Sequence, residues 1–584
     1  MKKNFYYTLS LLLLLILQLS CSAKNSKINP LHIKTENNSS SLNLADIPKE
    51  SSLVYHFLAA NLAYQEGDFQ KAKKEWRLII KEDKDNLFSL HLPAVNFFLI
   101  TEDFPSAKKE LEKVIYSLSK EIATAIQTQQ KNTSSPPPPT LLQKKLNQTS
   151  IKKLAKVLYL YGRLLEEDKD FSTARYVYSL AYSLDKKNPW FKIFQIASWW
   201  RQGEKEKAIK EANTAIKESP KSPLLRYLSG VMYFYNADYK NAAKHLKIAY
   251  KTYPTNERIF TLYTQSLILA GNTKTLKQTI SKASKKYPNV TELKQLLNLL
   301  KKNSQLKLLT KSVEKVSSFE RKNFNIHLEL ARFMQSLKMF QQSLNELNLL
   351  LYSQPNNSKL RYIIASQLVA IGRKQEAVYK LLKIPFQDPL YEKARLFAAV
   401  LLSNQNKNKE ALKILQEAYQ KEKNSASITL FLIDLYSKEK NYSKAISLLK
   451  NLIKEQKRPS VALLYKLALL YFQKGDKRKS LNLMEKVLKL EPSHSDALNF
   501  LAYSLAEEDK NLERALNLVK KALEIQPTNG YYLDTLGWVY FKQGNLKEAE
   551  RYIREAVKAT QNDVVILEHL PEILERKGNI KEAY

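Results

Sequence analysis

The chain has 584 residues, of which 94 are Lys or Arg and 57 are Asp or Glu, so its formal net charge is +37 at pH 7. Its single cysteine excludes an intramolecular disulfide and any metal site built from several cysteines. The chain is also rich in Asn, Ile, Tyr and Phe, as AT-rich genomes favour, so the positive charge alone does not identify a partner.

The N-terminal residues have the features of an export signal. Lys2 and Lys3 precede an apolar run, Leu9 to Leu19, that ends just before Cys21. A short basic start, a short apolar stretch and small residues after it are typical of a secretory signal peptide. The run is shorter than the roughly 20 residues of a membrane-spanning helix.

The position of Cys21 resembles the lipobox of bacterial lipoproteins, although Gln18 stands where that family prefers Leu. The resemblance implies a signal peptide over residues 1–21 and a lipid anchor at Cys21. Cleavage after Ala23 and an uncleaved anchor are the alternatives. Ser22 favours the outer membrane of a two-membrane bacterium, with the chain facing the periplasm; a soluble periplasmic protein is the alternative location.

Three segments precede the main body of the chain. Residues 22–50 are polar and rich in Asn and Ser, which predicts a flexible tether. Residues 53–121 have the pattern of two helical repeat units. Residues 122–150 include Pro136 to Pro139, which exclude a helix, so we interpret this segment as a Pro-rich linker that lets the first two units move.

An alanine then recurs every 34 residues, at Ala174, Ala208 and Ala242, at Ala377, Ala411 and Ala445, and at Ala515, Ala549 and Ala583. A fixed period of this length indicates stacked helical units rather than one globular core. Twelve units begin near residues 155, 189, 223, 257, 291, 324, 358, 392, 426, 461, 495 and 530, followed by a partial unit from Val564.

Each unit has the pattern of a helical hairpin. In the unit 530–563, apolar residues at helical spacing are followed by the turn Gly544-Asn545 and a second apolar stripe. Gly537 and Ala549 lie where the two helices cross, so neither position accommodates a large side chain. One hairpin is too small to bury its own apolar face and must stack on its neighbours.

The spacing of small residues resembles that of tetratricopeptide repeats, for example Gly230, Ala242, Ala249 and Pro254 in the unit 223–256. The resemblance implies an all-α, right-handed solenoid of stacked hairpins over residues 155–584. It also implies that client proteins or peptides bind in a groove lined by the first helix of each unit. The groove positions hold Trp190, Trp200, Tyr227, Phe234, Tyr465, Phe472, Tyr503, Tyr531, Trp538 and Phe541. The alternative is that these rings pack between adjacent repeats.

The segment 274–322 is the most basic part of the chain. Its candidate patch consists of Lys274, Lys277, Lys282, Lys285, Lys286, Lys301, Lys302, Lys307 and Lys311. Such a patch attracts anionic partners over about one Debye length, roughly 8–10 Å. Peptidoglycan, lipid and an acidic protein are the candidate partners; an ordinary solvated face is the alternative.

Motifs for catalysis or cofactor binding are absent from the sequence. There is no H-E-x-x-H, no G-x-S-x-G and no P-loop, and the seven histidines form no close pair. We therefore expect no enzymatic activity, no catalytic residue, no metal and no cofactor. Export makes nucleic acid an unexpected partner.

These features together predict a non-catalytic scaffold or assembly factor at the bacterial cell envelope. A binder of anionic envelope surface and a regulatory subunit of an envelope enzyme are the alternatives. The last unit stops at Tyr584 before its second helix, which we attribute to truncation, or else to docking on another chain.

Overall fold

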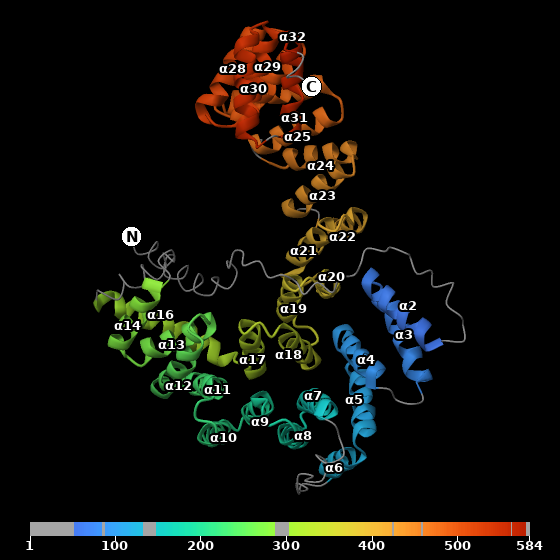
Figure 1. The fold of residues 1–584 in the computed structure, drawn as a ribbon, viewed down its shortest axis with the longest axis vertical. Coiled ribbons are helices and arrows are strands. Elements are labelled where there is room, and N and C mark those ends of the chain that lie inside the picture. Colours follow the sequence, from blue (N-terminus) through green and yellow to red (C-terminus); the bar gives the residue numbers. More distant parts are fainter. Residues whose placement is uncertain are drawn as a thin grey trace. The chain divides into compact units, whose positions relative to one another are not determined.

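The computed structural model describes residues 52–83, 88–131, 148–286, 303–422, 425–456, 460–561 and 563–579 (Figure 1). Every regular element within these ranges is an α-helix. The chain divides into two compact units, here called unit 1 (up to Ile384) and unit 2 (from Pro385). The predicted signal peptide, Cys21, the tether, Pro136 to Pro139, Lys301 and Lys302 lie outside the described residues.

Unit 1 begins with a group of helices that precede the Pro-rich segment. They are α2 (Ser52–Glu66), α3 (Phe69–Glu82), α4 (Phe88–Thr101), α5 (Phe104–Leu118) and α6 (Lys120–Lys131). The sequence predicts a linker from residue 122, but α6 continues to Lys131. Ile122, Ala123 and Ile126 are buried on one face of α6, and this apolar face packs against α5 and α8.

The next eight helices form an array of hairpins. They are α7 (Gln148–Glu167), α8 (Phe171–Leu184), α9 (Pro189–Gln202), α10 (Lys205–Glu218), α11 (Pro223–Tyr235), α12 (Tyr239–Thr252), α13 (Glu257–Leu269) and α14 (Thr273–Lys286). Acidic N-caps help to start the second helices: Asp170 accepts from the Thr173 amide at 3.1 Å, and Asp238 accepts from the Asn241 amide at 3.0 Å.

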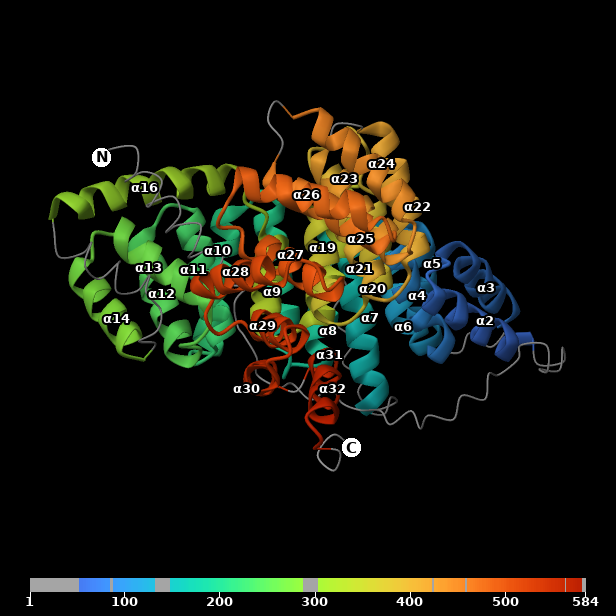
Figure 2. The ribbon, with the colours of Figure 1, turned by 90° about the horizontal axis from the view of Figure 1, so that it is seen from above.

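Five helices complete unit 1. They are α16 (Asn303–Lys322), α17 (Ile326–Ser336), α18 (Phe340–Ser353), α19 (Ser358–Ala370) and α20 (Lys374–Leu382). The chain turns back on itself here, because α17 packs against α9 and α13 while α18 packs against α7 and α4. Figure 1 shows α17 and α18 inside the arc formed by α7 to α14, and Figure 2 shows unit 1 from above.

Unit 2 starts where the helical hairpins are interrupted by Pro385 and Pro389, which cannot donate backbone hydrogen bonds. Its helices are α21 (Tyr391–Ser403), α22 (Asn408–Lys421), α23 (Ala426–Lys438), α24 (Tyr442–Lys454), α25 (Val461–Gln473), α26 (Lys477–Leu490), α27 (Ser495–Glu507), α28 (Leu512–Ile525), α29 (Gly530–Lys542), α30 (Leu546–Ala559), α31 (Val564–Leu567) and α32 (His569–Arg576). The principal contacts in unit 2 join helices that are neighbours in sequence.

The small residues of the repeat pattern lie where paired helices cross. A Cβ atom added to Gly537 would lie 2.8 Å from the Ile553 side chain and 3.1 Å from the Ala549 carbonyl oxygen. One added to Gly230 would lie 2.5 Å from Leu246. Because real Cβ atoms do not approach so closely, any larger residue at these two positions would push the helices of the hairpin apart.

Candidate functional site

The four groove aromatics predicted in unit 1 are buried, and two of them, Trp190 and Tyr227, pack against α17 of the same chain. The Tyr227 ring stacks on Phe333 with centroids 3.6 Å apart, and the Trp190 ring lies 6.2 Å from the same residue. Trp200 meets Phe324, just before α17, edge to face at 6.0 Å. With Phe234, these rings expose at most 8% of their surface. The first-helix face of unit 1 is therefore occupied by α17, and these rings are not open to a client.

A buried ion cluster connects α7 to the α17–α18 hairpin. Arg163 is fully buried and donates to Glu346 at 2.9 Å, to Glu166 at 2.6 Å and to Glu167 at 3.1 Å. The two ring nitrogens of His327 lie 3.1 Å from carboxylate oxygens of Glu166 and Glu346. Such charges are tolerated in a protein interior only when they are paired in this way.

Two glutamates of this cluster, Glu166 and Glu346, have lowered pKa values. Burial by itself would raise the pKa of Glu166, but His327 and Arg163 hold that pKa well below its usual range. Burial by itself would also raise the pKa of Glu346, but Arg163 and hydrogen bonds from His327 and Tyr159 lower it. Both carboxylates are therefore charged in the folded protein at neutral pH.

A second buried cluster joins α11 and α13 to α17. Arg258 donates to both carboxylate oxygens of Glu329, at 2.7 and 2.6 Å, and the Tyr227 hydroxyl donates to Glu329 at 2.5 Å. A bidentate pair fixes the orientation of both side chains as well as their distance. Glu346, on the adjacent helix α18, thus connects the α17–α18 hairpin to α7 at the start of the array. Glu329, on α17 itself, connects the hairpin to α11 and α13.

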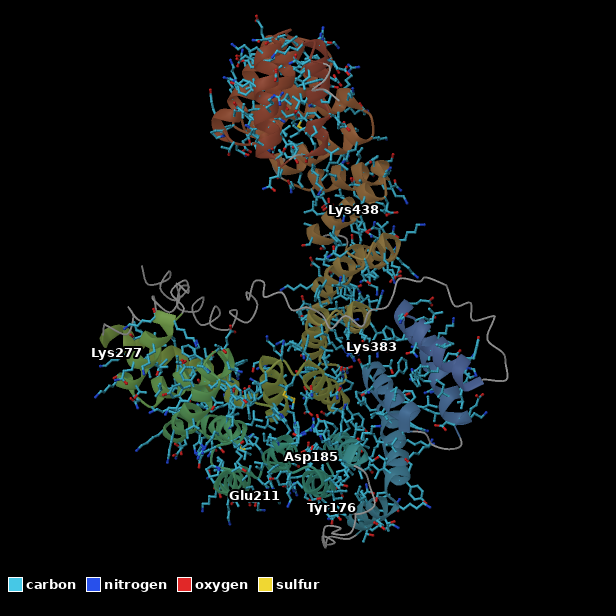
Figure 3. The ribbon with its side chains drawn as sticks, viewed as in Figure 1. Tyr176, Asp185, Glu211, Lys277, Lys383 and Lys438 are labelled. Atoms are coloured by element: carbon cyan, nitrogen blue, oxygen red, sulfur yellow. The ribbon has the colours of Figure 1, made fainter. Side chains whose placement is uncertain are left out.

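The N-terminal hairpins are also attached to the later part of unit 1. Glu102, in the turn between α4 and α5, accepts from Arg361 at 2.5 Å, Lys380 at 2.9 Å and Lys383 at 3.2 Å; Figure 3 labels Lys383. Burial would raise the pKa of Glu102, but its cationic neighbours lower it to about 2. Although the sequence suggests that residues 53–121 move independently, these contacts tie them to α19 and to the C-terminal end of α20.

The six groove residues predicted in unit 2 differ in accessibility. Phe472 on α25 and Tyr531 on α29 expose 42% and 53% of their surface, and Tyr465 and Tyr503 are half-buried. Trp538, like Phe541, is buried: its ring stacks on His569 of α32 at 4.3 Å, and its Nε1 donates to Glu507 at 2.6 Å. The open part of this face therefore centres on Phe472 and Tyr531.

The basic segment lies on α14 and α16. Lys274, Lys277, Lys282, Lys285 and Lys286 are exposed on α14, and Lys307 and Lys311 are exposed on α16. Phe319, which is not among the candidate residues of the sequence, is 71% exposed on α16. The Arg163 and Arg258 clusters were likewise absent from the sequence prediction, although His327, Glu329 and Glu346 stand out as ionisable residues within apolar stretches.

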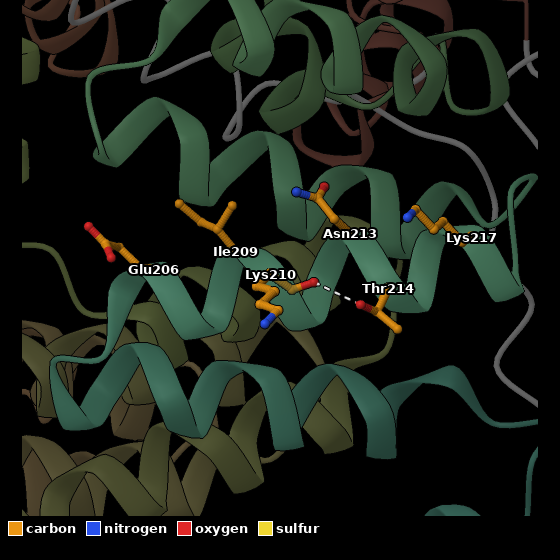
Figure 4. Close-up of a pocket in the computed structure, with 6 residues that line it drawn as sticks. All are labelled: Glu206, Ile209, Lys210, Asn213, Thr214 and Lys217. Carbon is orange, nitrogen blue, oxygen red and sulfur yellow. Dashed lines mark hydrogen bonds between the residues drawn. The ribbon is translucent and has the colours of Figure 1, made fainter.

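Hollows on the surface are shallow or partly filled. The one in Figure 4 is lined by Glu206, Ile209, Lys210, Asn213, Thr214 and Lys217, all from α10, so it has no opposing wall that could enclose a small molecule. Another, of about 290 Å³, lies where α17 and α18 meet α7 and α9, beside Trp190.

Among the described residues, no group of three or more His, Cys, Asp or Glu side chains could hold a metal ion. No helix in the described ranges has the length and apolar character needed to cross a membrane.

Comparison with known proteins identifies the type of repeat. Residues 392–584 and residues 199–257 each match a family model of the tetratricopeptide repeat. A search of curated proteins finds no match. These matches identify residues 199–257 and 392–584 as tetratricopeptide repeats, and the helical hairpins of the described residues confirm the predicted all-α helical-repeat solenoid.

Several solved structures are similar to parts of the chain. MamA from Desulfovibrio magneticus RS-1 is 21% identical, with 27% of this chain and 89% of that chain covered and a TM-score of 0.25. A tetratricopeptide repeat protein from Parabacteroides merdae is 18% identical over 34% of this chain and 77% of its own, with a TM-score of 0.30. The APC/C hetero-tetramer Cut9–Hcn1 is 13% identical, with 90% of this chain and 97% of that chain covered and a TM-score of 0.30.

Proposed function

We propose that this chain is a non-catalytic interaction scaffold that binds a client protein or peptide along the first-helix face of unit 2. Tetratricopeptide repeats are typically interaction modules, and the longer family match, residues 392–584, covers nearly all of unit 2. In unit 1 the corresponding face is filled by α17. Unit 2 is therefore the part of the described chain where this face remains accessible.

The client surface centres on exposed aromatic side chains. Phe472 contacts Phe500 edge to face at 5.1 Å, so one side of its ring is already supported while the rest faces solvent. Tyr531 donates to Asp563 at 3.0 Å, which orients its ring at the surface. Fully burying one such ring contributes about 1.5–3 kcal/mol, enough for two rings to act as anchors for a helical or extended peptide.

The exposure of Phe472 and Tyr531, against the burial of the equivalent rings in unit 1, is the observation that carries the proposal. A photo-crosslinking amino acid at position 472 tests it, with position 116 as the control, because Tyr116 is an equally exposed aromatic residue of unit 1 (52%). We expect a defined client to crosslink from position 472 and not from position 116. The same set of proteins captured from both positions would contradict the proposal.

We further propose that the scaffold is exported and held at the bacterial envelope by a lipid on Cys21. This proposal rests on the N-terminal sequence: the basic start, the short apolar run and the position of the cysteine. Replacing Cys21 by Ser should move the protein from the membrane fraction to the soluble fraction. Unchanged partitioning of the Cys21→Ser variant would exclude the lipid anchor.

A further inference from the structure

A surface that the proposed function does not use lies at the end of unit 1 formed by α14 and α16. Both helices pack on α13, and Figure 2 shows them on either side of it. The α14 helix has five lysines and no acidic residue, and Figure 3 labels Lys277 at this end of the unit. Lys307, Lys311 and Lys315 on α16 form no salt bridge within the described part of the chain.

The exposed face of α16 combines two kinds of side chain in separate stripes. With about 100° per residue, Lys307, Lys311 and Lys315 form one exposed stripe. Leu308 and Phe319 form a second stripe immediately beside it, with 37% and 71% of their surface exposed. The opposite side of the helix is buried through Leu309, Val313 and Ser317. The α16 helix is therefore anchored to unit 1 and presents a basic and apolar edge to solvent.

We infer that this edge of α16 docks on an anionic lipid bilayer. A helix lying in a membrane interface needs apolar side chains that enter the acyl boundary and flanking cations that reach the headgroups. A soluble acidic peptide or polymer would be attracted by the lysines but would gain nothing from Phe319 pointing into water. The coincidence of Phe319 with the lysine stripe selects the lipid surface.

This surface is separate from the proposed client face, which lies on unit 2. Each lysine near an anionic bilayer contributes favourably and additively, and the contribution falls within a Debye length of the surface. The lysines should therefore govern how strongly binding depends on salt. Phe319 should govern the part of the binding that persists when salt is raised, because burial of an aromatic ring is not screened.

Co-sedimentation with vesicles tests the inference. The full chain carries Cys21→Ser, so that acylation cannot contribute, and is mixed with vesicles of equal parts phosphatidylglycerol and phosphatidylcholine or of phosphatidylcholine alone. We expect binding to the anionic vesicles only, since binding through the N-terminal apolar run would appear with both. The triple variant K307Q/K311Q/K315Q should weaken binding on the order of a hundredfold. Phe319→Ser should weaken it by about tenfold and abolish what remains at high salt.

Matched variants on unit 2 control for the loss of charge and of apolar surface. Lys474, Lys486 and Lys489 are exposed, as is Leu490 at 51%. The variants K474Q/K486Q/K489Q and Leu490→Ser should leave vesicle binding unchanged. Circular dichroism should show the same helix content for every variant, because only exposed side chains are changed.

Three results would overturn the inference. The first is equal binding to neutral and anionic vesicles, or binding to neither. The second is an equal loss of binding in the matched unit 2 variants. The third is binding that is insensitive to Phe319→Ser and is reproduced with soluble polyglutamate, which would assign the patch to an acidic polymer instead of a bilayer.

Discussion

Arg163 and Glu346 are 183 positions apart in the sequence and form a fully buried ion pair at 2.9 Å. The pair joins the first helix of the main array to the hairpin that occupies the array's own first-helix face. Because of this contact, unit 1 is closed by its own chain, and it differs from unit 2 although both are built from the same kind of hairpin.

The first prediction concerns this ion pair. Replacing Glu346 by Ala removes one of the three carboxylates that pair with Arg163 and one of the two beside His327. Loss of one partner of a buried pair costs about 3–5 kcal/mol. Hydrogen exchange of α7 and α17 should become faster while exchange in unit 2 stays unchanged. The control is Glu485→Ala, since Glu485 pairs with Arg514 at the surface, where a pair contributes at most about 1 kcal/mol. Equal effects of the two variants would contradict the closure of unit 1.

The second prediction is an acid-sensitive contact between α4–α5 and α19–α20. The folded pKa of Glu102, about 2, lies below its ordinary value of 4.5. A lowered acid pKa stabilises the folded state above the ordinary value, and this stabilisation is lost as the pH falls toward the folded value. Exchange of α4 and α5 should therefore accelerate between about pH 4.5 and pH 2. Glu102→Gln should remove this part of the pH dependence; an unchanged slope would exclude Glu102 as its source.

The third prediction separates buried groove rings from exposed ones. Trp190→Ala removes a ring packed against Phe333 and should lower the free energy of unfolding by about 3–5 kcal/mol. Phe472→Ala removes a ring that is 42% exposed and should change stability by less than about 1 kcal/mol while weakening client binding. Urea denaturation measures the first effect and client crosslinking the second. A stable Trp190→Ala variant that loses client binding would instead show that the client binds on the first-helix face of unit 1.

The fourth prediction concerns α32. Burial would lower the pKa of His569, but the hydrogen bond that its ring donates to Asp534 and the negative charge of Asp534 outweigh this effect, so the net effect raises that pKa above 6.5. Burial also raises the pKa of Asp534, which shows that the pair is costly to bury although its two members attract each other. Glu572 and Glu507 add negative charge nearby and act in the same direction on His569.

A histidine with a raised folded pKa stabilises the folded state below its ordinary pKa, and this stabilisation is lost as the pH rises through the folded value. Exchange of α32 should therefore be faster at about pH 8 than at about pH 6, after correction for intrinsic rates. In the His569→Gln variant the difference should vanish. An equally large difference in that variant would assign the pH dependence to another group.

The sequence predicts the repeats well because their signal is local. Small residues such as Gly537 and Ala549 are required where the two helices of their hairpin cross. Helices α9, α11, α13, α25, α27 and α29 begin at the residues where the period places a unit. The same period identifies which first-helix side chains face the groove. It does not say what covers them, because the repeat containing α17 has the same period as the others.

The parts that the sequence did not predict are non-local. Contact between Tyr227 and Phe333, or between Arg163 and Glu346, depends on how far the array curves before the chain returns, and this is a sum of small rotations between successive hairpins. The predicted start of the Pro-rich linker, residue 122, also differs from the structure, because Ile122 and Ile126 belong to α6, a short helix with a narrow apolar face.

The pairing of Arg163 with Glu346 also imposes an order on folding. A growing chain that has not yet reached Ile326 contains Arg163 and the rings of Tyr227 and Trp190, but it lacks Phe333 and Glu346, which contact them in the folded protein. Local hairpins form early, whereas a contact across 183 positions must wait for synthesis and for closure of the intervening loop. During that interval Tyr227 and Trp190 lack the cover of α17, and Arg163 has only the carboxylates of its own helix, Glu166 and Glu167. The nascent chain therefore exposes aromatic surface that the finished protein buries.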